Sequence, residues 1–425
     1  MKPLLTLAAV SIGLYAAMPS FARPGLVAAH LVLTLGMLGA WRLVGRGETR
    51  AWRAALLAAV AFRLVLASQP PALSDDVYRY VWDGRVQAAG HHPYKFAPAD
   101  RMRAPLRDAT IYPRINHPEI PTIDPPLAEM LFAGLAWAGL GVRGFKITMA
   151  LFDIGAVAAL VALLRALGRP RHHVILYAWN PLAVVETAWS GHVEPVGVAL
   201  LLLALAAITR GHGARAAAAL AAAVQTKLLP LLLVPGFVRR LKSREVLVLV
   251  GVAALLAAPY ALRGPAYGAG VLTYAHRWEH GSIAFPAILA LYERLDLAPL
   301  LKGAIASPQE LARLTVGLLA LGWAVAQSFR ARIDAAHEAR LALGGALLLA
   351  PTLHPWYLLW VLPLAAAAPA GGWLLAAALI PLQYLAGPGE VAWPWRVAIL
   401  GPPVAWMAVD SWRAWRRRRA APDAT

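Results

Sequence analysis

The chain has 425 residues, of which 60% are hydrophobic and 15% charged, and its mean hydropathy is +0.58. An ordinary soluble domain has roughly 45–50% apolar residues, whereas repeated apolar runs of about 17–25 residues fit a bilayer core of roughly 30 Å. The composition therefore excludes an ordinary soluble domain and predicts an all-α, polytopic transmembrane helical bundle. The net charge of +18 does not indicate a nucleic-acid partner, because the basic residues form short clusters between apolar runs. Cysteine is absent, which excludes disulfides and thiolate chemistry.

Residues 1–69 are expected to form N-terminal transmembrane helices. Their beginning has the character of a signal peptide, with Ser20 and Ala22 at plausible cleavage positions, but an uncleaved first helix is the favoured interpretation. Cytoplasmic loops carry an excess of lysine and arginine. When the arginine clusters between the apolar runs are placed in the cytoplasm, the chain has about twelve spans in the plasma (inner) membrane. Residues 413–425 then form a basic cytoplasmic tail.

Residues 70–126 form a large loop that this orientation places outside the cytoplasm. In its segment "SDDVYRYVWDGRVQAAG", Ser74 is positioned to N-cap a helix that Gly90 ends. Asp75 and Asp76 then lie in the first turn, where the helix dipole favours negative charge. This structural account explains both carboxylates, but it leaves Asp83 and the following "HHPY" unexplained.

A catalytic account uses the same helix. A carboxylate at the membrane surface that aromatic side chains partly desolvate has a raised pKa and suits a general base. Asp76, Tyr80 and Asp83 share one face of the predicted helix, and Asp75 and Arg79 are spaced for an ion pair. We favour Asp75 as the general base of an extracytoplasmic catalytic loop, with Asp76 as the alternative and Asp83 in support.

Residues 127–412 are expected to form a transmembrane bundle with short loops, but two segments depart from simple spans. The run 127–141 is predicted to be a short helix embedded from the outer side. The segment 214–238 is predicted to be re-entrant and broken near Lys227 and Pro230, which is tolerated at membrane depth only inside protein or beside a cavity. A lysine within an apolar run is costly and usually functional or paired, so Lys227 is a candidate for one of these roles.

The order of residues in the first loop is itself informative. Asp75, Tyr78, Asp83, Gly90, Pro93 and Tyr94 follow one another before "DPPLAEMLFA" at 124–133. This order resembles the first outer loop of GT-C-type membrane glycosyltransferases, in particular the polyprenyl-phosphate-mannose-dependent mannosyltransferases, including the GPI mannosyltransferase type. "HPWYLLWVLPL" at 354–364 is similar to a late segment of that type, so the resemblance spans roughly residues 60–365. Val77 replaces the second aspartate of the D-x-D-Y motif, which leaves both Asp75 and Asp76 as candidates.

The resemblance implies a GT-C fold and a transferase that moves a sugar, most readily mannose, from a polyprenyl-phosphate donor. The acceptor is a hydroxyl of a glycan, lipid or protein of the cell envelope, and membrane lipids are the other partners. Cations are needed at the phosphate leaving group, where charge develops, and the apolar face of a sugar stacks on aromatic rings. The candidate phosphate-binding residues are Arg79, Arg85, His91, His92, Lys95, Arg277 and His354. The candidate sugar-binding residues are Tyr78, Tyr94, Trp278, Trp356 and Tyr357, although an interfacial aromatic belt is the commoner role for any one tryptophan.

No cofactor is expected, and a divalent metal is an open but unfavoured alternative. None of the nearby acids and histidines has the spacing of a helical metal motif such as H-E-x-x-H. His192 and Glu194 are read as a polar loop pair. The residues that would have to converge on a metal are Asp75, Asp76, His91, His92, Glu279 and His280.

Two rival functions belong to other classes. A transporter or lipid flippase would carry functional charges near the bilayer midplane, often at the interface of internal repeats, and no repeat is evident in this chain. A non-catalytic membrane assembly subunit would need neither Asp75 nor Asp76.

Overall fold

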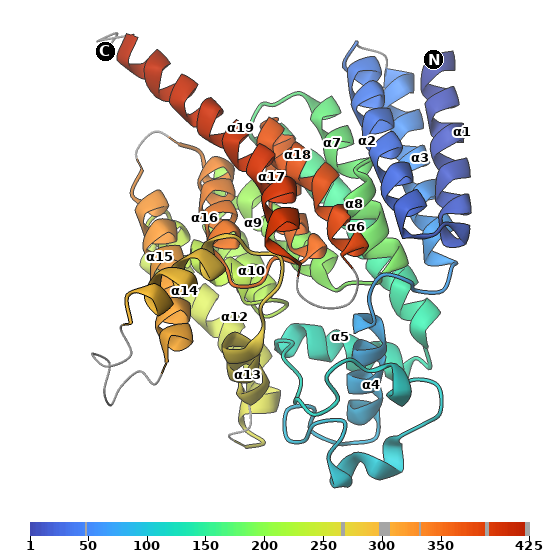
Figure 1. The fold of residues 1–425 in the computed structure, drawn as a ribbon, viewed down its shortest axis with the longest axis vertical. Helices are drawn as coiled ribbons and strands as arrows, with labels where there is room; N and C mark the ends of the chain where they lie inside the picture. Colours follow the sequence, from blue (N-terminus) through green and yellow to red (C-terminus); the bar gives the residue numbers. More distant parts are fainter. Residues whose placement is uncertain (47–48, 265–267, 297–306, 331–332, 387–390, 421–425) are drawn as a thin grey trace.

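The computed structural model describes residues 1–46, 49–264, 268–296, 307–330, 333–386 and 391–420. These residues form α-helices and short 3₁₀ and π turns, and isolated β-bridges join His280 and Gly281 to Thr352. The expected all-α class is therefore confirmed. A body of packed helices stands above a smaller lobe that contains α4 (Asp76–Ala88), α5 (Pro126–Trp137) and the irregular chain between them, and both termini lie at the opposite end (Figure 1).

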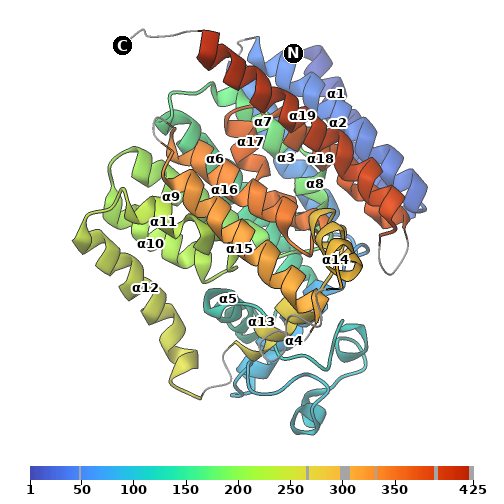
Figure 2. The ribbon, with the colours of Figure 1, turned by 60° about the vertical axis from the view of Figure 1, so that its left-hand side comes forward.

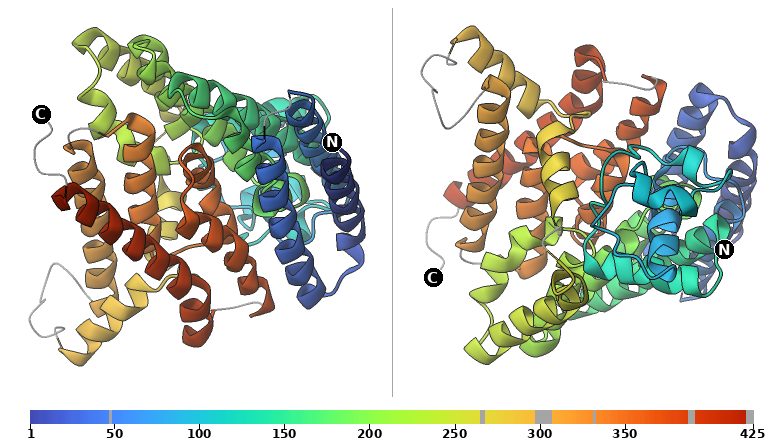
Figure 3. Two further views of the ribbon diagram at one scale, coloured as in Figure 1. Left: turned by 90° about the horizontal axis from the view of Figure 1, so that it is seen from above. Right: turned by 90° about the horizontal axis from the view of Figure 1, so that it is seen from below.

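The N-terminal helices stand at one edge of the body (Figure 3). They are α1 (Lys2–Ala17), α2 (Arg23–Gly45) and α3 (Thr49–Ala67). The ring of Tyr15 lies 5.1 Å from that of Phe62, and Phe62 in turn lies edge-on to Trp179 in the next part of the chain. These buried aromatic contacts attach the first three helices to the body.

The middle of the body begins with α6 (Val142–Ala166), the longest helix in this region. A buried ion pair of 2.7 Å between Arg63 and Asp153 joins α3 to α6, and the hydroxyl of Tyr177 donates to the same carboxylate. A buried charge is stable only when it is paired and hydrogen-bonded, so this cluster specifies how the two helices pack. The following elements are α7 (Ile175–Ala178), α8 (Pro181–Val184), the π-helical turn η5 (Val185–Trp189), α9 (Glu194–Thr209), α10 (Gly213–Val224), η6 (Leu229–Leu233) and α11 (Val234–Val238).

The last part of the chain completes the body. The helix α12 (Ser243–Ala261) lies at its periphery (Figure 2). The other elements are α13 (Ala269–Arg277), α14 (Ala284–Arg294), α15 (Pro308–Ser328), α16 (Ala335–Leu349), η8 (Pro355–Trp360), α17 (Leu362–Ala367), α18 (Gly371–Leu379), η9 (Ile380–Leu385) and α19 (Trp393–Ala420).

The lobe is held together by a close approach of α4 to α5. A Cβ atom on Gly84 would lie 2.3 Å from the carbonyl oxygen of Phe132, so only glycine allows this packing. The rings of Tyr80 and Phe132 stack with their centroids 4.7 Å apart, and Phe132 also faces Phe145 of α6 at 6.2 Å. The lobe is thus anchored to the start of α6. Two short 3₁₀ turns, η2 (Arg101–Leu106) and η3 (Tyr112–Arg114), lie in the irregular segment.

Five helices among the described residues are long and apolar enough to cross a membrane: α1 with its 3₁₀ extension, α2, α6, α12 and α15. Several shorter apolar helices accompany them, including α5, α9 and α10. The chain is therefore a multi-pass membrane protein, although five candidate spans are fewer than the twelve expected. The predicted break in the segment 214–238 is present, because α10 ends at Val224 and only short turns follow around Lys227 and Pro230. Residues 421–425 of the predicted tail lie outside the described residues.

Candidate active site

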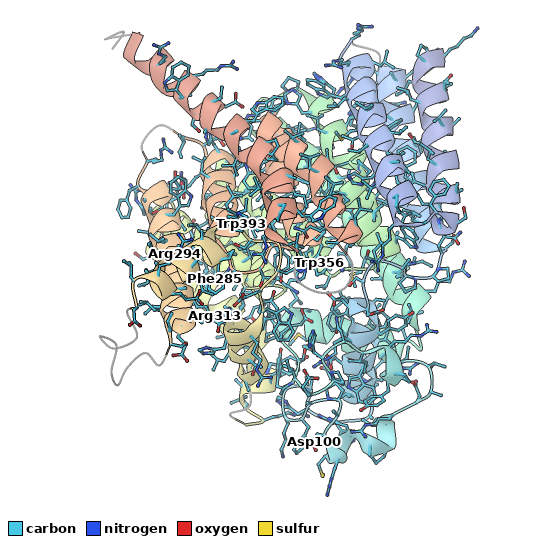
Figure 4. The ribbon with its side chains drawn as sticks, viewed as in Figure 1. Asp100, Phe285, Arg294, Arg313, Trp356 and Trp393 are labelled. Carbon is cyan, nitrogen blue, oxygen red and sulfur yellow. The ribbon has the colours of Figure 1, made fainter. Side chains whose placement is uncertain are left out.

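A cavity of about 270 Å³ lies between the lobe and the body. The start of α4 and the lobe segment 116–124 form one wall, and α13, the turn after α10 and the start of η8 form the other. Figure 4 shows Trp356, a lining residue, at the lower end of the body next to the lobe. The polar and aromatic residues that line the cavity are Ser74, Asp75, Asp76, Arg79, Tyr80, Asn116, His117, Thr122, Asp124, Lys227, Tyr274, Trp278, His354, Trp356 and Tyr357.

The helix that carries the paired aspartates begins one residue later than expected. Asp75, not Ser74, is the N-cap, and Ser74 instead accepts a hydrogen bond of 3.2 Å from the backbone N–H of Asp76. Asp75 is exposed, whereas Asp76 is half-buried. Gly90 follows the end of the helix with a φ of 81°, as its predicted role as a terminator requires.

Asp76 is held more firmly than the adjacent Asp75. The amide of Asn116 donates a hydrogen bond of 2.7 Å to its Oδ1 atom. Its Oδ2 atom lies 3.8 Å from Nε2 of His192, a fully buried ring. Burial raises the pKa of Asp76 above that of an ordinary aspartate, and the hydrogen bond from Asn116 opposes this rise. A fixed carboxylate with a raised pKa has the properties of a general base.

His192 links Asp76 to a set of buried polar side chains, Glu186 and Tyr384. Its Nδ1 atom lies 3.6 Å from Oε2 of Glu186, and Oε1 of Glu186 accepts a hydrogen bond of 2.6 Å from Tyr384. Glu186 lies in the π-helical turn η5, and Gly191, with a φ of 82°, turns the chain just before the histidine. The ring of His192 also packs against Trp356, with centroids 4.1 Å apart. His192 therefore connects two carboxylates and contacts a cavity tryptophan, which goes beyond the loop pair expected for it.

Lys227 follows the end of α10 and reaches the same cavity. Its Nζ atom lies 3.2 Å from Oδ1 of Asp124 and 3.7 Å from Oε1 of Glu194. Asp124 and Glu194 are both buried. Of the two roles expected for this lysine, functional or paired, the structure shows that it is paired.

An apolar groove of about 370 Å³ adjoins the cavity. The two spaces share Ile123, Lys227, Tyr274, Trp278 and Tyr357, and the rest of the groove is mostly aliphatic. Arg313 lies at its wall, where Glu279 pairs with it at 2.8 Å and Phe285 lies beneath its guanidinium (Figure 4). The polar cavity thus adjoins the apolar groove, and Lys227 lies where the two meet.

The predicted ion pair between Asp75 and Arg79 is wrong. Arg79 pairs with Asp83 at 2.8 Å, and its Nη1 atom also donates to the carbonyl of Ile120 at 3.0 Å. Asp83 is buried and needs a partner, whereas water solvates the exposed Asp75. Asp83 therefore lies outside the cavity and orients Arg79, which lines it.

The cavity contains part of the set of predicted site residues. Asp75, Asp76, Arg79, Trp278, His354, Trp356 and Tyr357 come together there. The others lie elsewhere, and most have partners of their own. Arg85 pairs with Asp108, His92 contacts the carbonyl of Tyr260 at 3.0 Å, Tyr94 donates to the carbonyl of Asp124 at 2.7 Å, Tyr78 accepts from Arg114 at 2.8 Å, and His91, Lys95 and Arg277 are exposed.

Sequence reasoning missed several residues of the cavity, among them Asn116, Asp124 and Tyr274. Asn116 and Asp124 come from the irregular part of the lobe, and Tyr274 comes from α13, where its hydroxyl hydrogen-bonds to that of Tyr357. A signal existed for Asp124, because a lysine placed at membrane depth requires a carboxylate partner. No group of three or more acids and histidines is placed to hold a metal ion within the described parts of the chain, so the six residues considered for a metal do not converge there.

Comparisons with known proteins identify the family. A family model described as "Alpha-(1->6)-mannopyranosyltransferase, N-terminal domain" matches residues 6–243, more than half of the chain, and one described as "MptB C-terminal domain" matches residues 302–385. No curated protein matches the chain. A crystal structure of ArnT from Cupriavidus metallidurans bound to undecaprenyl phosphate is similar, with 16% identity, 87% of this chain and 73% of that chain covered, and a TM-score of 0.42. The chain therefore belongs to the alpha-(1->6)-mannopyranosyltransferase family and is a GT-C membrane mannosyltransferase that uses polyprenyl-phosphate mannose.

Proposed function

We propose that mannosyl transfer takes place in the cavity between the lobe and the body, with Asp76 as the general base and Lys227 as the cation at the leaving phosphate. The observation that carries this proposal is the position of Lys227, which lines both the polar cavity and the apolar groove. A polyprenyl-phosphate sugar matches this order of groove, lysine and cavity, because it consists of an apolar chain, an anionic phosphate and a polar sugar ring.

The donor fits these spaces in one direction. The polyprenyl chain lies in the groove against aliphatic side chains such as Leu228 and Leu232, and its phosphate lies at Lys227. The mannose ring then occupies the cavity, which Trp278 and Trp356 line. His354 also lines the cavity, and its ring stacks on that of Trp356 with the centroids 4.3 Å apart.

The reaction is a single displacement at the anomeric carbon. Asp76 takes the proton of the acceptor hydroxyl while the new bond from oxygen to carbon forms and the bond from carbon to phosphate oxygen breaks. The leaving phosphate keeps the electron pair, and Lys227 stabilises the charge that develops there. Single displacement inverts the anomeric centre, so an α product requires a β-linked donor. The 1→6 linkage makes the acceptor hydroxyl the 6-hydroxyl of a sugar, so the acceptor carries a glycan.

The orientation proposed for the chain follows from its basic clusters. Residues 70–126 lie on the extracytoplasmic side, and the short apolar helices of the body complete about twelve crossings of the membrane together with the five long ones. This arrangement places the cavity at the outer surface, where a lipid-linked donor in the membrane meets an acceptor glycan outside it.

Labelled donors test the proposed function. Proteoliposomes with the full chain are supplied with β- or α-linked polyprenyl-phosphate [14C]mannose and an α-mannoside acceptor that has a free 6-hydroxyl. We expect label from the β-linked donor in a product that an α-1,6-specific mannosidase cleaves, and none from the α-linked donor. Equal use of both anomers would contradict single displacement. Movement of labelled lipid across the bilayer without product would favour a flippase.

The pH dependence of the reaction is a further prediction. Burial raises the pKa of Asp76, and a base must be unprotonated, so kcat/KM should fall with decreasing pH from a point above the ordinary aspartate pKa of about 3.9. The hydrogen bond from Asn116 lowers this pKa, so Asn116→Ala should move the acid limb to higher pH. His117→Ala, a change at the neighbouring residue, is the control. An acid limb that Asn116→Ala leaves in place would argue against Asp76 as the titrating base.

A further inference from the structure

A second cavity, of about 340 Å³, lies on the other side of α4, where the end of α3 and the lobe meet the beginning of α6. Its charged lining residues are Arg114, Arg143 and Lys146, and its lining contains no aspartate or glutamate among the described residues. Ser68, Tyr78 and Thr110, whose side chains carry hydroxyl groups, also line it. None of these residues lines the transfer cavity, so the two spaces are separate.

Lys146 is the most unusual of the three cations because it is fully buried. Its ammonium group donates to the backbone carbonyls of Leu66 and Gln69, near the end of α3. An ammonium group has three donors, so one remains beyond these two contacts. No carboxylate pairs with Lys146 in the part of the chain that the structure describes. A buried cation without a counter-charge is costly.

The beginning of α6 adds to this positive potential. The helix has 25 residues, its N-cap Gly141 provides no side-chain cap, and its first turn contains no acidic residue. The first N–H groups of a helix lack intrahelical partners, and the helix dipole places partial positive charge at this end. Arg143 and Lys146 therefore lie at the end of the helix where cations are unfavourable. An anion bound here would offset both the burial of the unpaired Lys146 charge and the repulsion between these cations and the helix dipole.

Arg114 completes the site from the lobe. Its Nη1 atom donates to the hydroxyl of Tyr78 at 2.8 Å, and its guanidinium lies over the ring of Tyr78, 5.2 Å from the centroid. These contacts hold the guanidinium in place and leave other N–H donors for a ligand. Arginine recognises phosphate through two parallel hydrogen bonds, so the side chain of Arg114 suits a phosphate group better than a simple halide.

We infer that this cavity binds the phosphate of a phosphate ester, separately from the donor phosphate in the transfer cavity. Three cationic residues and an uncapped helix N-terminus border one space, and the described residues that line it include no carboxylate. The site lies at the same end of the body as the lobe, next to α6, a membrane-spanning candidate (Figure 1). The ligand is either the headgroup of an anionic phospholipid or a soluble phosphate ester.

Binding measurements on the purified full chain distinguish these sources. Native mass spectrometry with short-chain phosphatidylglycerol, compared with phosphatidylcholine, probes the lipid headgroup, and calorimetric titration with inorganic phosphate probes the soluble anion. The test variants are Lys146→Gln and the double variant Arg114→Gln/Arg143→Gln, whose residues are exposed and so tolerate replacement. The double variant Arg101→Gln/Arg294→Gln removes the same charge from exposed positions outside the cavity and serves as the control.

We expect one phosphatidylglycerol, or one phosphate, to bind to the wild type and to the control variant. Affinity should fall about tenfold or more in both test variants, since each loses charge-assisted hydrogen bonds. Preference for phosphatidylglycerol over inorganic phosphate would identify a lipid headgroup, and the reverse would identify a soluble ester. Equal affinity in the test and control variants, or no binding of either probe to the wild type, would overturn the inference.

Discussion

Replacement of Asp76 by asparagine is expected to lower kcat for mannosyl transfer by about 10²–10⁴-fold, the usual contribution of a positioned general base. Asparagine has the same shape and retains an oxygen that accepts the hydrogen bond from Asn116, so the cavity should keep its structure. The amide does not take up the acceptor proton, however. The loss should therefore appear in kcat, with little change in the KM for the donor and little change in Tm.

Asp75→Asn is the matched control, because it removes the same charge one residue away. Asp75 is exposed at the N-cap of α4 and makes no capping hydrogen bond with its side chain, so transfer should be nearly unchanged. Loss of transfer in Asp75→Asn with activity retained in Asp76→Asn would make Asp75 the base, as its position in the family motif favours. Full activity in both variants would show that neither Asp75 nor Asp76 is the base.

Much of this site could be predicted because its chemistry is local in the sequence. Seven of the residues that line the cavity, among them Asp76 and His354, come from short segments whose composition departs from that of the surrounding apolar runs. Lys227 was identifiable for the same reason, as a lone charge within an apolar segment. The short helix expected within residues 127–141 is also present, as α5.

The contacts that complete the site could not be predicted in the same way. Asn116 and Asp124 come from a segment without periodicity, so nothing in their spacing indicates which side chains turn toward the cavity. Lys227 and Asp124 are separated by 103 positions and meet only because the lobe folds against the body. The incorrect pairing of Asp75 with Arg79 has a related cause: spacing permits two partners for Arg79, and burial, which the sequence does not show, selects Asp83.

Lys227→Met is expected to have the second large effect, on both activity and stability. The change leaves Asp124 and Glu194 buried without their cation, and breaking a buried ion pair in this way typically costs about 3–5 kcal/mol. It also removes the charge that stabilises the leaving phosphate, and loss of one such group commonly lowers kcat by about 10²–10³-fold. The measurements are Tm and the transfer rate of the purified full chain.

The double variant Lys227→Met/Asp124→Asn separates the two effects. Asparagine removes one of the unpaired buried charges, so Tm should recover in large part, since a buried charge is far costlier than a neutral amide. Transfer should remain low, because no cation replaces Lys227 at the junction between the cavity and the groove. If transfer instead recovers together with Tm, Lys227 acts only as a structural partner of the two carboxylates. Arg79, which also lines the cavity, would then be the next candidate for the cation at the leaving phosphate.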